Sequence, residues 1–325
     1  MTYWTAEDNV AGKLGKALFI ILPTIGCYRY RMGKACYMCS YPTSAPKRRW
    51  SQGEIIEYVE EALEKVEDED RVAVRMFTSG SFFDDSELKP ETRRIIFRLI
   101  SEMENVREIV VESRSELVRY EAVRELAEIA GDRHFEVAIG LETANDDVAD
   151  VAINKGNTFA DFVRAADTVH SAGAYVKTYL LLKPAFMSER DAIEDVKASL
   201  TKAEPYTDTF SINPTNVQKG TVYERLWEKR EYRPPWLWSV VEALLWAKRR
   251  LGDKRVLCDP VGAGSRRGPH NLGGDSDRVI GEAVRKFSAT QDVTYLNLDD
   301  DGSRRVWEYV VERGLLDWQL DEWLF

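Results

Sequence analysis

Residues 17–42 read ALFIILPTIGCYRYRMGKACYMCSYP, an apolar run followed by three cysteines. The run at 17–22 has the composition of a buried strand. Cys27, Cys36 and Cys39 follow it with the spacing C-x8-C-x2-C. Because the active groups of α/β barrels gather where strands end, this loop marks the expected functional edge of the fold.

The three thiols fit a metal cluster better than a disulfide framework. Four cysteines in 325 residues are too few to staple so long a chain. Three thiolates can hold three irons of a [4Fe-4S] cluster, whereas a cluster that only carries electrons normally has four protein ligands. The fourth, open iron predicts chemistry on a bound small molecule, for which S-adenosylmethionine (SAM) is the obvious candidate.

Beyond the loop, strand and helix patterns alternate for some 200 residues. The capping box Ser51-Gln52-Gly53-Glu54 predicts the start of the first helix. Such βα repeats require parallel strands with right-handed crossovers. We therefore expect an α/β fold, a partial (β/α)6 barrel open on one side, with a doubly wound open sheet as the alternative. The strands are predicted at 17–22, 72–77, 108–111, 135–140, 175–182 and 209–212, and the further helices at 91–103, 116–130, 159–171 and 189–203.

The regular alternation of strand and helix patterns ends after about residue 212. Prolines break the pattern at 232–235, and a tryptophan-rich helix is predicted at 236–251. We expect the barrel to occupy residues 1–212 and an α+β extension, packed on the barrel, to occupy 213–325. Two more short strands are predicted in the extension, at 255–258 and 293–298.

Composition limits the protein class. The chain is 44% hydrophobic and 31% charged, as in ordinary globular proteins. It has no apolar run long enough to span a bilayer and no recognisable secretion signal, which predicts a cytoplasmic location away from membranes. The formal net charge of −10 argues against an unaided grip on nucleic acid over a broad surface. Local basic clusters, however, suit a nucleic-acid substrate that another protein helps to deliver.

Polar and charged residues follow successive predicted strands. Thr78-Ser79-Gly80-Ser81 ends the second strand, and its small residues allow close backbone approach to a ligand. Together with charges at the next strand ends, they suit a zwitterionic amino-acid cofactor, whose carboxylate needs cations and whose ammonium needs acids. The residues expected to bind the cofactor are Met38, Thr78, Ser79, Gly80, Ser81, Glu112, Arg114, Glu142 and Lys177.

These motifs carry a family resemblance. The cysteine loop, the Thr-Ser-Gly-Ser turn and Gly140-Leu141-Glu142-Thr143 resemble the radical SAM superfamily. The long cysteine spacing is closest to the branch that includes the Elp3-type tRNA-modifying enzymes. That superfamily usually has an aromatic residue just before the third cysteine, whereas Met38 occupies this position here.

Longer stretches at 33–42, 77–84, 211–221 and 266–271 resemble the radical SAM subunits of archaeosine synthases, over about residues 17–310. The resemblance implies an archaeal lyase in tRNA modification that uses a [4Fe-4S] cluster and SAM. It would cleave the lysine C–N bond of a lysine-modified 7-deazaguanine (preQ0-lysine) in the tRNA D-loop to give archaeosine. The implied partners are tRNA, a transferase-type synthase subunit and an electron-donor protein.

Substrate contacts are expected mainly from the extension. Its glycine-rich loop carries arginines and a histidine that could meet a phosphate or the lysyl carboxylate. The residues expected to contact substrate are Lys183, Asn213, Asn216, Gln218, Arg266, Arg267, His270 and Asn271.

Two other interpretations stay open at this point. One is a different superfamily enzyme, such as an Elp3-like or coproporphyrinogen-type protein. The other is a structural zinc-binding or interaction protein. A structural zinc site normally has four Cys or His ligands, and the sequence has no fourth one between Gly26 and Trp50. Cys258 and the tryptophans of 227–246 are expected to pack in the core.

Overall fold

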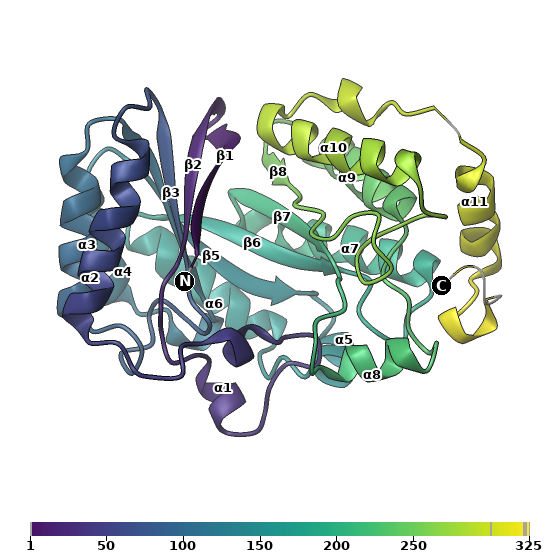
Figure 1. Ribbon diagram of the computed structural model, residues 1–325, viewed down its shortest axis with the longest axis horizontal. Coiled ribbons are helices and arrows are strands. Elements are labelled where there is room, and N and C mark those ends of the chain that lie inside the picture. Colours follow the sequence, from purple (N-terminus) through teal and green to yellow (C-terminus); the bar gives the residue numbers. More distant parts are fainter. Residues whose placement is uncertain (1, 300, 321–323, 325) are drawn as a thin grey trace.

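One eight-stranded sheet runs through the molecule in the order β1-β2-β3-β4-β5-β6-β7-β8. The computed structural model describes residues 2–299, 301–320 and 324. β1 pairs antiparallel with β2, and every later neighbour pairs in parallel, so the sheet curls into a partial barrel (Figure 1). The strands are β1 (Tyr3–Val10), β2 (Lys13–Ile21), β3 (Val72–Phe77), β4 (Val106–Ser113), β5 (His134–Glu142), β6 (Tyr175–Leu182), β7 (Thr209–Pro214) and β8 (Arg255–Leu257).

Helices cover the outside of the sheet. Figure 1 shows α2, α3 and α4 along one side and α9 and α10 along the other. The main helices are α2 (Gln52–Leu63), α3 (Pro90–Glu102), α4 (Tyr120–Ala130), α6 (Phe159–Ser171), α7 (Glu189–Ala203), α9 (Leu237–Leu251), α10 (Asp275–Thr290) and α11 (Ser303–Arg313). Shorter ones are α1 (Tyr28–Arg31), α5 (Asp146–Val148) and α8 (Val222–Glu228).

The predicted capping box opens α2. The Ser51 side chain accepts a hydrogen bond from the Glu54 N–H, and the Glu54 carboxylate accepts one from the Ser51 N–H. Ile55, Val59 and Ala62 then lie on one buried face of the helix, within the main core between sheet and helices. Local sequence and tertiary packing thus agree at this helix.

The barrel architecture confirms the predicted fold class, with differences at its edges. β8 lies at the predicted place and pairs with β7, so the extension shares the sheet of the barrel. The strand predicted at 293–298 is wrong, because Val293–Leu296 forms a 3-10 turn instead. The sequence analysis also missed β1, an edge strand whose residues 4–7 are polar or exposed and lack the alternation that marks a half-buried strand.

Buried charges close the end of the barrel where the strands begin. Arg75 of β3 contacts Glu108 of β4 at 3.3 Å, and Arg255 of β8 bridges Glu108 at 2.6 Å and Glu136 of β5 at 2.7 Å. Lys177 of β6 lies in this charged floor, since its register neighbour Thr209 hydrogen-bonds Glu136. We therefore look for the functional site at the opposite end of the barrel, where the strands finish.

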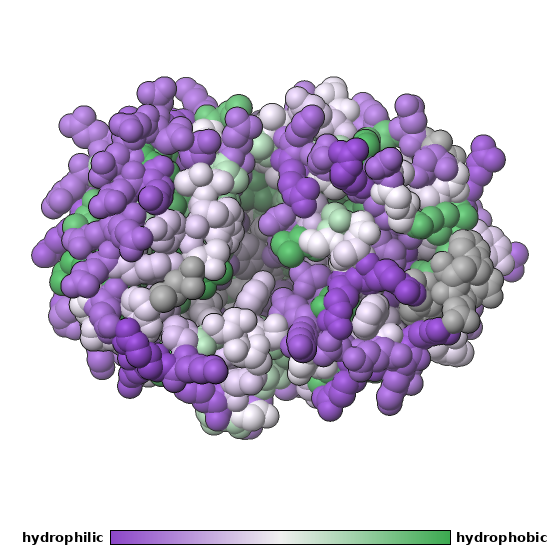
Figure 2. Space-filling view, in the orientation of Figure 1, coloured by the Kyte–Doolittle hydropathy of each residue, from purple (hydrophilic) through white to green (hydrophobic). Residues whose placement is uncertain are grey.

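No helix within the described residues is both long enough and apolar enough to cross a membrane. The space-filling view shows a hydrophilic surface with a recess in the middle of one face, between the α2–α4 side and the α9–α10 side (Figure 2).

Candidate active site at the mouth of the barrel

The cysteine loop leaves β2 at the mouth and packs directly on the turn after β3. The Cys27 N–H donates to the Ser79 carbonyl at 2.9 Å. Gly80 permits this approach, because a Cβ there would lie 2.8 Å from both Cα and N of Cys27. The predicted small-residue turn therefore positions the first cysteine, a role that requires glycine at residue 80.

The segment after β5 anchors the second half of the loop. The Tyr37 N–H donates to the Ile153 carbonyl at 2.8 Å, and the Asn154 side-chain amide donates to the Ala35 carbonyl at 2.8 Å. The Arg29 guanidinium donates to the Asn154 carbonyl at 3.1 Å and lies against Gly156. Cys36 is thereby fixed between two backbone-anchored neighbours.

The extension holds the loop from the other side. Gln218 Oε1 accepts hydrogen bonds from the Ser40 N–H at 2.7 Å and the Ser40 hydroxyl at 2.9 Å. The Val222 N–H, at the start of α8, donates to the Tyr37 carbonyl at 3.1 Å. In Figure 1, α1 and α8 accordingly lie on the same side of the molecule. Gln218, expected to contact substrate, here positions the cysteine loop.

The donor set fits the cluster predicted from the sequence. Cys27, Cys36 and Cys39 are free and half-buried. Burial raises the pKa of the Cys39 thiol to about 12, and the Cys36 and Cys27 charges add to this effect. Iron would offset this cost, because thiolates bind metals in the deprotonated form. Among described residues, no three Cys, His, Asp or Glu groups are placed to hold one metal ion, whereas a four-iron cluster binds each thiolate on a separate iron.

Met38 lies where the cysteine loop meets the rest of the mouth. Its side chain packs against one apolar cluster that includes Val217 and Tyr223 and against another that includes Ile153 and Leu181. Met38 thus bridges the loop, the strand ends and the extension, which keeps it a candidate for cofactor contact.

The hydroxyls of the turn after β3 are mostly committed to the protein. Thr78 Oγ accepts the Gly80 N–H at 3.1 Å, and Ser81 Oγ hydrogen-bonds Ser113 Oγ at 2.8 Å. The buried Glu87 carboxylate accepts the N–H groups of Gly26 and Ser81, each at 3.2 Å. Sequence reasoning missed Glu87, which clamps the cysteine loop to this turn. The buried Ser81 side chain therefore supports the turn and does not offer a free hydroxyl to a ligand.

Glu112 of β4 is a half-buried carboxylate at the mouth whose pKa departs clearly from its ordinary value. Burial raises its pKa to about 7, while hydrogen bonding by Tyr179 opposes the shift. Its neighbour Tyr41 was not predicted from the sequence. Tyr41 is 62% exposed, and the surrounding protein, followed by the Glu112 and Cys39 charges, raises the pKa of its hydroxyl to about 12.

The other predicted charges at the mouth are paired. Glu142 accepts a hydrogen bond from the Lys155 ammonium at 2.9 Å. Arg114 donates to the Lys155 carbonyl at 2.7 Å and also contacts Asn157 and Glu116. These pairs join β4 and β5 to the segment after α5, and they leave both signs of charge at the mouth.

Two predicted lysines are buried inside the protein. Lys177 is 3% exposed in the charged floor, where burial lowers its pKa to about 8. Lys183 is fully buried, and its ammonium lies 2.7 Å from both Glu189 and Asp317. Since two carboxylates already hold it, we assign Lys183 a structural role.

The predicted residues of the extension divide into two groups. Asn213 near the end of β7 and Asn216 just after the strand are half-buried, and the Ser211 hydroxyl donates to Asn213 Oδ1 at 3.1 Å. Arg266 is exposed, whereas Arg267 pairs with Glu224 and lies over the Trp227 ring at 4.6 Å. These residues remain candidates for substrate contact.

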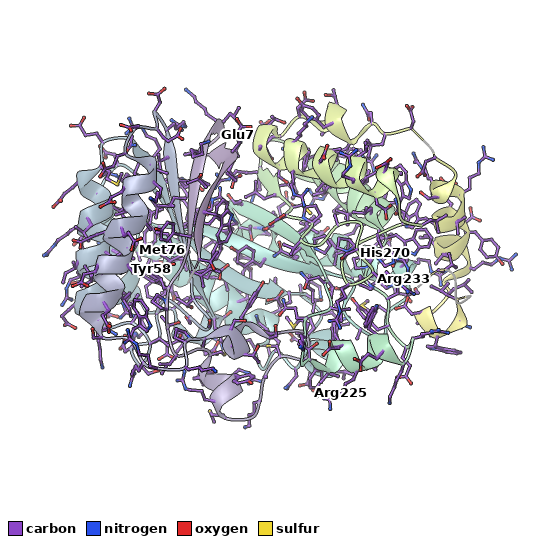
Figure 3. The ribbon with its side chains drawn as sticks, viewed as in Figure 1. Glu7, Tyr58, Met76, Arg225, Arg233 and His270 are labelled. Atoms are coloured by element: carbon purple, nitrogen blue, oxygen red, sulfur yellow. The ribbon has the colours of Figure 1, made fainter. Side chains whose placement is uncertain are left out.

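His270 and Asn271 form the second, buried group of the extension (Figure 3 labels His270 and Arg233). Burial, followed by the nearby Arg233 charge, lowers the pKa of His270 to about 3. The imidazole is therefore neutral at physiological pH and cannot supply the expected cation for a phosphate. Its Nδ1 hydrogen-bonds the Gly268 carbonyl at 2.8 Å, and Arg233 donates to the His270 and Asn271 carbonyls.

Comparison with known proteins places these features in context. Residues 21–196 match the family model described as the radical SAM superfamily. The chain is 73% identical over 324 residues to archaeosine synthase subunit beta of Thermococcus kodakarensis. The match covers 99% of this chain and 100% of that protein. It is 44% identical over 311 residues to archaeosine synthase subunit beta of Methanosarcina acetivorans, with 95% and 89% covered.

The fold itself is also found among solved structures. A solved structure of Elp3 of Methanocaldococcus infernus with an N-terminal deletion superposes with a TM-score of 0.56 at 13% identity. The match covers 84% of this chain and 63% of that one, and at this identity it concerns the fold alone.

Proposed function

The chain belongs to the radical SAM superfamily and, within it, to the family of archaeosine synthase beta subunits, and from this premise we propose that it is the radical SAM component of an archaeosine synthase. The observation that carries the proposal is the 73% identity across almost the whole of both chains. Family membership decides against the alternative of a zinc-binding or interaction protein. An Elp3-like activity has only a shared fold in its support.

A [4Fe-4S] cluster and SAM are the proposed cofactors. Cys27, Cys36 and Cys39 would hold three irons, which leaves the fourth for SAM. When bound, the pair supplies a one-electron reductive cleavage of SAM that yields a 5′-deoxyadenosyl radical. The protein would hold the three thiols in place through Ser79, Ile153 and Gln218.

The charged groups of the mouth suit the amino-acid end of SAM. Glu112 would accept its ammonium, since no cation among the described residues hydrogen-bonds this carboxylate and, unlike Glu87, it does not clamp the backbone of the cysteine loop. Arg114 and Lys155 are the nearby cations that would face its carboxylate. The Thr78–Gly80 turn offers backbone groups next to Cys27.

We propose a tRNA substrate that carries a lysine-modified 7-deazaguanine, whose lysine C–N bond is cleaved to leave archaeosine. Asn213, Asn216 and Arg266 of the extension would contact the substrate nucleotide. An alpha-type subunit that attaches the lysine is the proposed partner, since the relatives are named as beta subunits. A separate protein would supply the electron.

Nucleoside analysis tests this function. The protein, reconstituted anaerobically with iron and sulfide, is incubated with SAM, a reductant and lysine-modified tRNA. We expect the modified nucleoside to convert to archaeosine, and the reaction without SAM serves as the control. Retention of the lysine-modified nucleoside under cluster-loaded conditions would overturn the proposal.

A further inference from the structure

The charge of this acidic chain is distributed unevenly. Residues 22–53 contain six Lys and Arg residues and no Asp or Glu. The rest of the chain has 39 Lys and Arg against 55 Asp and Glu, a formal net charge of −16. The acid-free stretch is the one that builds the cysteine loop and leads into α2, so positive charge is concentrated beside the mouth.

Part of this stretch folds against the turn that follows β3. Arg31 donates to the Ser86 hydroxyl at 3.0 Å, and Arg49 donates to the Ser86 carbonyl. Lys89 and Arg119 directly precede α3 and α4, whose N-terminal ends lie on the same side as the strand ends. In Figure 2, strongly hydrophilic side chains gather at the lower left, near α1 and the start of α2. We call the exposed residues Arg31, Lys34, Lys47, Arg49, Lys89 and Arg119 the basic rim.

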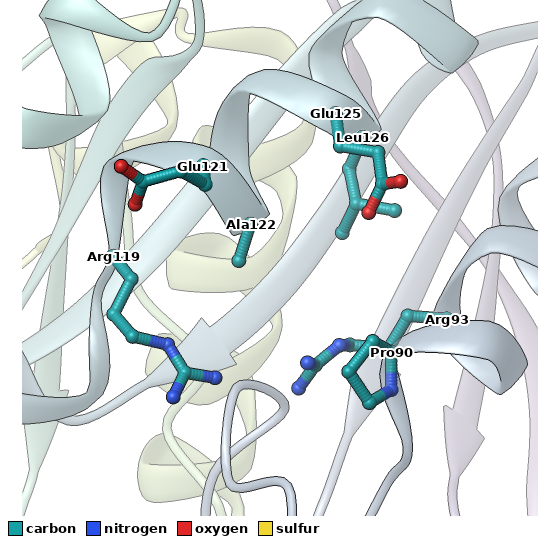
Figure 4. A pocket seen from close by; sticks show the side chains of 7 residues that line it. All are labelled: Pro90, Arg93, Arg119, Glu121, Ala122, Glu125 and Leu126. Carbon is teal, nitrogen blue, oxygen red and sulfur yellow. The ribbon is translucent and has the colours of Figure 1, made fainter.

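A surface hollow between α3 and α4 adjoins the rim (Figure 4). Arg93 and Arg119 lie on one side of it, and Glu121 and Glu125 on the other. The two arginines share one carboxylate, Asp85, at 2.6 and 2.8 Å. One acid thus faces two guanidinium groups, which leaves this edge of the hollow with a net positive charge.

Most of the rim is not neutralised within the protein. Within the described part of the chain, the ammonium groups of Lys34, Lys47 and Lys89 have neither a hydrogen bond nor an ion pair. Two rim arginines do have carboxylate partners, since Arg31 lies 3.8 Å from Asp84 and Arg119 lies 2.8 Å from Asp85. An unpaired exposed ammonium group breaks no existing ion pair when it turns toward a ligand anion.

Exposed aromatic side chains accompany the cations. Tyr30 and Tyr41 are 40% and 62% exposed on the same loop. Cations that contact phosphates, interleaved with rings on which bases can stack, are the two elements of single-stranded nucleic-acid binding. An acidic protein surface would use the cations but has no particular need of the tyrosines.

We propose that the basic rim binds the phosphate backbone of the RNA substrate and thereby presents one nucleotide to the mouth. This inference rests on the proposed function and adds the side of the molecule from which the RNA is held. Each neutralised phosphate releases counterions, so binding through the rim must weaken steeply with salt.

Two matched triple variants test the rim. The first, K34A/K47A/K89A, removes its three unpaired ammonium groups. The second, K13A/K65A/R107A, removes the same charge from exposed residues near the opposite ends of the strands. Affinity for tRNA is measured over a series of salt concentrations, with iron content and thermal unfolding as folding controls. We expect the rim variant to bind roughly 10- to 100-fold more weakly, with the slope of log K against log salt smaller by about two to three, and the second variant to bind like the wild type.

Equal tRNA affinities of the two variants would overturn the proposal. So would a rim variant that keeps its tRNA affinity and is slow only with a flavodoxin as donor, not with dithionite, because the rim would then dock an acidic protein. The proposed function is judged separately, by archaeosine formation in the wild type. If the wild type forms no archaeosine while only the rim variant loses tRNA binding, the rim stands and the function falls.

Discussion

Gln218 holds Ser40 through two hydrogen bonds to one oxygen, at 2.7 Å from the backbone N–H and 2.9 Å from the hydroxyl. Ser40 directly follows Cys39, and Gln218 lies in the extension, so this contact couples the last cysteine to a segment 178 residues later in the chain. The extension therefore helps to set the geometry of the cysteines as well as lining the mouth.

Replacement of Gln218 by alanine tests that coupling. Loss of two hydrogen bonds, each worth roughly 0.5–1.5 kcal/mol, should loosen the cysteine loop and lower the iron retained after reconstitution. Gln291→Ala is the matched control, because Gln291 also bonds backbone groups through its side chain, those of Val256 and Ser288, but far from the mouth in sequence and structure. We expect both variants to lose stability in denaturant and only Q218A to lose iron. Equal iron retention in the two would show that the contact is incidental.

Gly80→Ala should disrupt the first cysteine. The added Cβ would lie 2.8 Å from Cys27 Cα and 1.9 Å from Glu87 Oε1, so the loop must move. We expect the visible absorbance of the cluster to fall by more than half. Gly53→Ala is the control, because its nearest neighbour beyond the helix backbone is 4.0 Å away and alanine favours a helix. A fully loaded G80A protein would contradict the proposed packing.

The raised pKa of Glu112, about 7, gives SAM binding a pH dependence. The protonated acid cannot pair with an ammonium group, so affinity should rise by about fivefold from pH 6 to pH 7 as the carboxylate ionises, below the pH at which an α-ammonium itself loses its proton. Glu112→Gln should bind SAM weakly and without this rise. Anaerobic titration of the cluster-loaded protein with SAM, monitored by calorimetry, measures both. A wild-type affinity for SAM that does not change with pH over this range would show that Glu112 does not pair with the ammonium group of SAM.

The same shift predicts an effect on stability with the opposite sign. Because the folded protein holds the Glu112 proton up to about pH 7, beyond the ordinary value of 4.5, ionisation of this group costs folding free energy as pH rises through that window. E112Q removes the cost and should unfold at a higher denaturant concentration than the wild type at pH 8. The difference should shrink steadily as pH falls toward 4.5, and a constant difference would contradict the assignment.

Lys183→Met distinguishes a structural lysine from one that contacts substrate. The variant leaves Glu189 and Asp317 buried without their shared cation, which should cost about 3–5 kcal/mol in the free energy of unfolding. Lys286→Met, at an exposed position on α10, should change little. A stable K183M protein with weakened tRNA binding would restore the role expected from the sequence.

The sequence predicts the barrel because periodicity and capping are local signals, as α2 illustrates with Ser51 and Glu54. The cysteine loop can likewise be predicted from the sequence, since its chemistry depends on residue type and spacing. The structural role of Lys183 could not be predicted from the sequence, because its partner Asp317 lies 134 residues away and no local pattern indicates the contact. Gln218 was expected in the correct region but for a different role, since contact with Ser40 depends on how the extension packs on the barrel.

The central claim is that SAM cleavage at the three-cysteine loop drives archaeosine formation. The most direct measurement is the molar ratio of 5′-deoxyadenosine to archaeosine when cluster-loaded protein acts on lysine-modified tRNA, with C27A, C36A and C39A variants beside the wild type. We predict that both products form in the wild type at a ratio near one, above the 5′-deoxyadenosine made without tRNA, and that each cysteine variant abolishes both. Archaeosine that forms without 5′-deoxyadenosine, or persists in a cysteine variant, would contradict the account.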